Sequence, residues 1–165
     1  TVIQTAKIME DRGMGHIRFK ILGQGPDEEK LKAYARETGV QNVDFVGFLP
    51  YEQMAAYLCR SNMTLNALKR NASQSIINKV ADYFSAGIPI LNGSCCKEMQ
   101  DMVEKYQVGL NYLSEDAQDL AEKILQLADD PAKCKVYGEN AKALAMAKFD
   151  RRTSYLELLK RIDNV

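Results

Sequence analysis

A chain of 165 residues is long enough to bury one hydrophobic core and suits a single domain over residues 1–165. Its 22 basic and 22 acidic side chains balance, so no overall field attracts nucleic acid, and we expect no nucleic-acid partner. No run of about 18 apolar residues is present, which argues against a membrane-spanning helix. The four cysteines lack the spacing of a zinc site, so we expect no metal and a reducing, cytoplasmic compartment.

Patterns typical of helices and strands alternate along the chain. Apolar residues at helical spacing predict helices, and short runs rich in strand-forming residues and closed by Gly or Pro predict strands. Strands are predicted over 17–22, 43–46, 63–67, 88–91 and 109–112. Helices are predicted over 2–9, 27–38, 51–59, 75–86, 97–105 and 114–127, from 131 onward, and over 155–162. In the second of these, Leu31 and Tyr34 are expected to join Ala35 on an apolar face.

This alternation predicts an α/β fold with a Rossmann-like, doubly wound parallel sheet. In such sheets ligands bind beyond the carboxyl ends of the strands, where the strand order reverses. We therefore expect the segments that follow the strands to surround one crevice. These segments are 23–26, 47–50, 67–78 and 92–95.

The helix predicted over 75–86 divides into two faces at about 100° per residue. Its apolar face consists of Ile76, Ile77, Val80, Tyr83 and Phe84. Its polar face consists of Ser75, Asn78, Lys79, Asp82 and Ser85. Gly87 is expected to end the helix in a left-handed conformation, and Pro89 cannot continue it.

The polar start of this helix suits an anion, since free N–H groups and the helix dipole both attract phosphate. Lys79 would add a positive charge, and Asp82 on the same face would accept hydrogen bonds from sugar hydroxyls. The alternative is an ordinary solvated helix in which Lys79 and Asp82 form a surface pair three residues apart.

The segment from Asp82 to Ile90 resembles the Glu-Ala-Met-Ala-x-Gly-x-Pro-Val signature of retaining glycosyltransferases of the GT4 type. The fuller form from Ser75 to Tyr83 is similar to a branch that makes bacterial surface polysaccharides. The two acidic residues that the family places eight positions apart would fall on Gln74 and Asp82. The second is conservatively replaced, whereas Gln74 lacks the charge.

Two glycine turns extend this resemblance. Gly23-Gln24-Gly25-Pro26 resembles the family's Gly-x-Gly-Pro turn, and the turn from Val46 to Pro50 resembles a segment whose backbone recognises the nucleotide base. Each has a structural alternative: a strand-to-helix turn needs glycine for its own reasons, and Phe48 could be a core residue. The order and spacing of the motifs fit the family over essentially the whole chain. The resemblance implies the C-terminal half of a GT-B fold, with the family's first strand absent from this chain.

What the resemblance implies is a donor site for a nucleotide diphosphate sugar, with no separate cofactor. Asp82 would hold the ribose, the helix start with Ser75 and Asn78 would hold the diphosphate, and Gln74 would contact the donor sugar. Lys79 would stabilise charge on the leaving diphosphate. Gly23, Gln24, Gly25, Gly47 and Phe48 would line the rest of the donor site.

The acceptor implied is a cell-surface polysaccharide or glycolipid, bound by an N-terminal domain that this chain lacks, in an enzyme at the inner face of the membrane. The chain alone would be inactive, and the edge left by the absent strand invites association with another chain. Two other classes stay open. One is a nucleotide-sugar epimerase of the same GT-B arrangement. The other is a non-catalytic α/β interaction domain.

Overall fold

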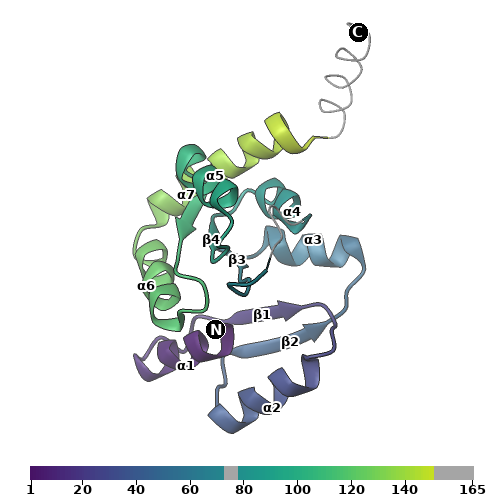
Figure 1. Ribbon diagram of the computed structural model, residues 1–165, viewed down its shortest axis with the longest axis vertical. Helices are drawn as coiled ribbons and strands as arrows, with labels where there is room; N and C mark the ends of the chain where they lie inside the picture. Colours follow the sequence, from purple (N-terminus) through teal and green to yellow (C-terminus); the bar gives the residue numbers. More distant parts are fainter. Residues whose placement is uncertain (73–77, 151–165) are drawn as a thin grey trace, which may run out of the picture.

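A computed structural model of the chain describes residues 1–72 and 78–150 (Figure 1). The strands in these ranges are β1 Phe19–Leu22, β2 Val43–Gly47, β3 Thr64–Asn66, β4 Ile90–Asn92 and β5 Gly109–Asn111. The helices are α1 Val2–Asp11, α2 Glu28–Thr38, α3 Tyr51–Cys59, α4 Lys79–Ser85, α5 Lys97–Tyr106, α6 Ala117–Ala128 and α7 Pro131–Leu144, which continues into a π-helical turn, η1 Ala145–Phe149. The helix expected over 155–162 and the first turn of the helix expected over 75–86 lie outside the described residues.

Within residues 1–72 and 78–150, all strand pairs are parallel, and they form two sheets. β1 pairs with β2, while β4 lies between β3 and β5 in the other sheet. Helices cover both faces: α1 and α6 pack over one hydrophobic cluster, and α4, α5 and α7 pack over another. The predicted doubly wound α/β fold is therefore confirmed.

The two hydrophobic clusters meet at β4. Leu91 belongs to the cluster beneath α1 and α6, whereas the adjacent Ile90 belongs to the cluster beneath α4, α5 and α7. Both side chains are fully buried. Successive side chains of a strand point to opposite faces, which explains why neighbouring residues of β4 lie in different clusters.

The end of α4 has the geometry that the sequence predicts. Val80 and Phe84 are fully buried, and Gly87 has a φ of +69°, which is the left-handed region. α7 crosses this turn closely, because a Cβ added at Gly138 would lie 2.2 Å from the carbonyl oxygen of Gly87. Glycine at position 138 thus permits α7 to pack against the turn between α4 and β4.

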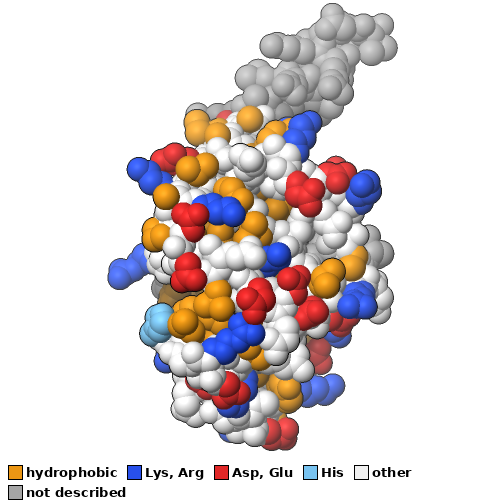
Figure 2. All heavy atoms as spheres, turned by 90° about the vertical axis from the view of Figure 1, so that its left-hand side faces the viewer, with side chains coloured by type: hydrophobic (Ala, Val, Ile, Leu, Met, Phe, Trp, Pro, Cys, Tyr) orange, Lys and Arg blue, Asp and Glu red, His pale blue; other side chains and the backbone are white. Residues whose placement is uncertain are grey.

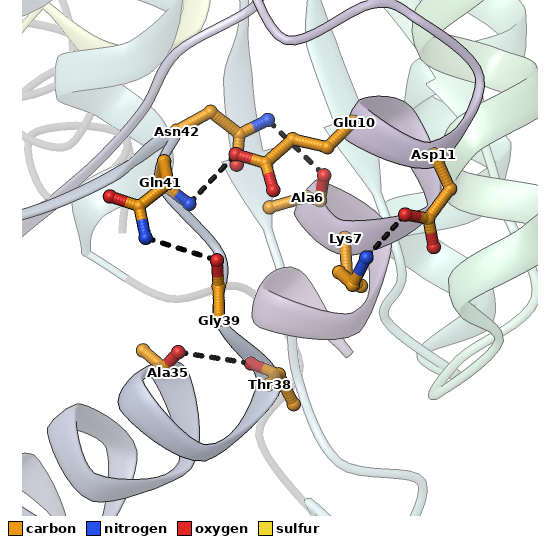
Figure 3. A network of polar contacts seen from close by, with 9 residues as sticks. All are labelled: Ala6, Lys7, Glu10, Asp11, Ala35, Thr38, Gly39, Gln41 and Asn42. Carbon is orange, nitrogen blue, oxygen red and sulfur yellow. Dashed lines mark hydrogen bonds and ion pairs between the residues drawn. The ribbon is translucent and has the colours of Figure 1, made fainter.

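α1 is tied to the turn between α2 and β2 by side chains that Figure 3 shows from close by. The backbone N–H of Gln41 donates to Glu10 Oε1 at 2.7 Å, and Asn42 Nδ2 donates to the carbonyl of Ala6 at 3.2 Å. Asn42 is buried. These bonds hold α1 against the segment that leads into β2.

Three local expectations are corrected. Leu31 and Tyr34 are 42% and 38% exposed, so α2 buries only Ala35. β4 begins at Ile90, two residues later than expected, because Pro89 has no N–H to donate to a ladder. α6 begins after Asp116, whose side chain accepts hydrogen bonds from two backbone N–H groups.

Within the two described ranges, no helix has both the length and the apolar character required to cross a bilayer.

Candidate functional site

The turns that follow β1 and β2 are joined at the carboxyl ends of these strands. The backbone N–H of Gly23 donates to the carbonyl of Gly47 at 2.8 Å. The φ angles of Gly23 and Gly47 are +124° and +80°, which other residues rarely adopt. A Cβ at either position, or at Gly25, would meet nothing within 4 Å. The backbone of these turns is open to an approaching ligand, and Gln24 between them is exposed.

The turn after β2 presents two aromatic rings to solvent. Phe48 is 68% exposed and Tyr51, the first residue of α3, is 67% exposed. The alternative that Phe48 is a core residue is therefore wrong. An exposed aromatic side chain beside an open backbone turn offers a flat apolar surface to a planar ligand.

Tyr51 links this turn to the polar face of α4. Its hydroxyl donates to Asp82 Oδ1 at 3.1 Å, across 31 positions of sequence. Asp82 is half-buried, whereas Asn78 and Lys79 at the start of α4 are exposed. The structure thus joins Asp82 to the first residue of α3, which follows the turn of Gly47 and Phe48. The sequence did not single out Tyr51, which makes this link.

The surface-pair alternative for α4 is not formed. In the described part of the chain, no ion pair joins Lys79 to Asp82, although they are three residues apart. Asn78 precedes α4, and its side chain makes no capping hydrogen bond at the start of the helix. Burial raises the pKa of the neighbouring Tyr83, and the nearby Asp82 carboxylate raises it further. Gln74 and Ser75 lie outside the described residues.

Three asparagines form a ladder across the carboxyl ends of β3, β4 and β5. Asn66 Nδ2 donates to Asn92 Oδ1 at 2.8 Å, and Asn92 Nδ2 donates to Asn111 Oδ1 at 2.8 Å. The three residues are in register in the parallel sheet. Sequence reasoning missed this ladder, although each of the three strands ends in asparagine, which was a readable signal.

The turn after β4 is shaped by close packing. A Cβ at Gly93 would lie 2.4 Å from the hydroxyl oxygen of Tyr112, so the ring occupies the space that a side chain would need. Burial raises the pKa of Tyr112 to about 12. Ser94 Oγ accepts the backbone N–H of Cys96 at 3.1 Å, and the thiols of Cys95 and Cys96 are free.

A hollow lies elsewhere on the described part of the chain. It has a volume of about 470 Å³ between α1, α2 and the start of α6, and Arg70 and Glu115 contribute to its lining. None of the predicted site residues lines it. Figure 2 views the molecule from the side of α1 and α6 and shows acidic and basic side chains interspersed there. We therefore place the candidate site at Asp82 on the basis of its contacts rather than of cavity size.

Among the residues at 1–72 and 78–150, no three His, Cys, Asp or Glu side chains gather as a metal site would require.

The fold and the position of these residues define the class: a Rossmann-like α/β domain with its candidate site at the carboxyl ends of the strands. Residues 1–130 match the family described as group 1 glycosyl transferases, and the chain belongs to that family. A search of curated proteins gave no match.

Solved structures share the fold. HepE of Anabaena in complex with UDP aligns with a TM-score of 0.80 at 16% identity, over 100% of this chain and 45% of that one. Sucrose-phosphate synthase of Thermosynechococcus elongatus gives a TM-score of 0.78 at 20% identity, over 98% and 41%. The C-terminal domain of the group 1 protein LpcC of Francisella tularensis gives 0.67 at 10% identity, over 91% and 78%.

These matches show the fold of the C-terminal half of GT-B glycosyltransferases, as expected. The chain spans 41% and 45% of the lengths of the first two structures.

Proposed function

We propose that this chain is the donor-binding half of a retaining glycosyltransferase that uses a nucleotide diphosphate sugar. The observation that carries the proposal is the hydrogen bond of 3.1 Å from Tyr51 to Asp82. It joins the aromatic turn after β2 to the helix that bears the family's second acidic position. Membership of the group 1 family supports the activity.

Each part of the site suits one part of the donor. The exposed ring of Phe48 and the open backbone at Gly47 offer a surface to the nucleotide base. Asp82 accepts hydrogen bonds from the ribose hydroxyls, as a carboxylate accepts strongly from O–H donors. The start of α4, with Asn78 and Lys79, receives the diphosphate.

The chemistry then rests on the leaving group. The bond between the anomeric carbon and the diphosphate oxygen breaks, and an acceptor oxygen bonds to the same face of that carbon. The acceptor proton passes to the departing diphosphate. Lys79 stabilises the charge that develops there, since a positioned cation acts most strongly on developing charge. Gln74 contacts the donor sugar.

The acceptor in this proposal is a cell-surface polysaccharide or glycolipid. It is bound by an N-terminal domain of a longer enzyme that works in the cytoplasm at the inner face of the membrane. The resemblance of the Ser75–Tyr83 segment to a polysaccharide-forming branch supports this choice.

Calorimetric titration with a panel of nucleosides and nucleoside diphosphates tests the proposal. Asp82→Ala should weaken binding of both ligand types at least about tenfold, because each lost charge-assisted bond is worth about 1.5–3 kcal/mol. Lys79→Ala should weaken binding of diphosphates far more than of nucleosides.

Lys135→Ala is the matched control, since this lysine lies on the exposed side of α7 with its side chain 79% exposed. It should leave every affinity unchanged. Equal losses for nucleoside and diphosphate in Lys79→Ala would remove Lys79 from the site. Unchanged binding in Asp82→Ala would refute the proposed donor site.

A further inference from the structure

The carboxylate of Asp82 accepts from a neutral donor rather than from a cation. The hydroxyl of Tyr51 donates to its Oδ1 at 3.1 Å, and in the described part of the chain Asp82 forms no ion pair. Asp44 shows the contrast, because Lys20 and Arg18 both pair with it. A carboxylate without a counter-ion keeps its negative charge available to other hydrogen-bond donors, and bonds to a charged acceptor are the strong ones.

Both partners of this bond are placed by their helices. Tyr51 is the first residue of α3 and follows Pro50, whose ring restricts the chain that leads into the helix. Asp82 lies on α4 between Val80 and Phe84, whose side chains are fully buried and anchor that helix. The bond joins α3 to α4 (Figure 1), so it limits the rotation of a carboxylate whose backbone is already fixed.

The bond from Tyr51 leaves most of the Asp82 carboxylate unused. A carboxylate has two oxygens and about four acceptor sites. Tyr51 fills one site on Oδ1, and among the described residues no other hydrogen bond reaches this side chain. Asp82 is half-buried, so a ligand can reach it. Two hydroxyls on neighbouring carbons of a ribose need two acceptor sites at a fixed spacing, which the remaining capacity supplies.

A second role for the same bond is to fasten α3 to α4. α3 contains no buried residue, so a side-chain bond could help to hold it. Tyr51 is 67% exposed, however, and an exposed hydrogen bond exchanges one partner for water at little net gain. A fastening bond affects stability and leaves the choice of ligand unchanged. The two roles therefore differ in one measurable property, the preference of the site for ribose.

We propose that Tyr51 is a positioning residue of the donor site, whose hydroxyl orients the Asp82 carboxylate toward the 2′ and 3′ hydroxyls of a ribose. This inference rests on the proposed function, in which Asp82 holds that ribose. A side chain that is ordered before the ligand arrives does not have to be ordered during binding, which raises the affinity. Tyr51 thereby adds to the preference for ribonucleotides over 2′-deoxyribonucleotides.

Calorimetric titration with ADP, GDP, CDP and UDP, and with the 2′-deoxy form of each, tests the proposal. The parent protein should bind the ribose form of its preferred diphosphate at least about tenfold more tightly than the deoxy form. Tyr51→Phe should weaken binding of the ribose form about threefold to tenfold. It should weaken the deoxy form less, because one of the two hydroxyls is absent there, so the ratio of the two affinities should fall.

Tyr57→Phe is the matched control, since it removes the same hydroxyl from another residue of α3, which is 39% exposed. It should leave both affinities unchanged. A double-mutant cycle shows whether Tyr51 acts through Asp82. In the background of Asp82→Ala, Tyr51→Phe should change neither affinity, because the group that it orients is gone.

An unchanged ratio of the ribose and deoxy affinities in Tyr51→Phe overturns the proposal, and a lower melting temperature with it would assign the bond to holding α3. Tighter binding in Tyr51→Phe also overturns it, because the hydroxyl would then compete with the ribose. So does an equal loss in the Asp82→Ala background, which would mean that Tyr51 contacts the ligand directly. Unchanged binding in Asp82→Ala refutes the proposed donor site itself, whereas an inert Tyr51→Phe alone leaves that site standing.

Discussion

Gly87 has a backbone conformation that a branched side chain resists. Gly87→Val places a Cβ on a residue with a φ of +69°, so we expect it to lower the free energy of unfolding by more than about 1 kcal/mol. Urea denaturation followed by circular dichroism measures the change. Gly15→Val is the control, because the φ of Gly15 lies outside the left-handed region. Equal losses for the two variants would contradict the explanation.

At this scale the sequence predicts residues whose role is local and misses those whose role depends on distant partners. Gly87 could be predicted because a helix end before Pro89 requires a left-handed residue. The bond from Tyr51 to Asp82 joins residues 31 positions apart, so no periodicity indicates it. The exposure of Phe48 likewise depends on tertiary packing, which its sequence neighbours do not indicate.

β1 and β2 are held together by ion pairs as well as by their ladder. Asp44 of β2 pairs with Lys20 and Arg18. The hydrogen bond from Lys20 is the largest cause that lowers the pKa of Asp44, burial opposes it, and Arg18 lowers the pKa further. A carboxyl group with a lowered pKa in the folded state stabilises the fold above its ordinary pKa, and that stability is lost as the pH falls through the folded-state pKa.

We therefore expect the urea midpoint of unfolding to be lower at about pH 3 than at pH 7. The difference should be smaller in Asp44→Asn than in the parent protein. Urea titrations at the two pH values measure the difference. Asp101→Asn, at an exposed position of α5, is the control. Its urea midpoint should drop between the two pH values as much as that of the parent protein. A loss in Asp44→Asn as large as in the parent protein would show that this carboxyl group contributes no acid sensitivity.

Most helices and strands could be predicted within two or three residues, because each carries its own pattern and end signals. The start of α7 at Pro131 is one example: Asp130 caps it through the N–H of Lys133 at 2.9 Å. The start of α6 was less accurate because Ser114, Glu115 and Asp116 all suit a helix start. The separation of β1 from β3 depends on strand order, which local patterns do not contain.

At the scale of the whole molecule, binding and transfer should separate. The 165-residue chain should bind nucleoside diphosphates but transfer no sugar, because in the proposed enzyme the acceptor is bound by another domain. A radiolabelled donor with glycolipid or polysaccharide acceptors measures transfer, and calorimetry on the same sample shows that the donor site is intact. Transfer by this chain alone would contradict the two-domain proposal.

The position of β4 between two hydrophobic clusters has a consequence for cooperativity. Ile90 and Leu91 are neighbours in the chain, yet each is packed in a different cluster. Neither cluster can open fully without releasing the strand that the other needs, so the two halves of the core must melt together. β4 has three residues and couples the unfolding of the two clusters. We therefore expect both clusters to unfold in a single cooperative transition.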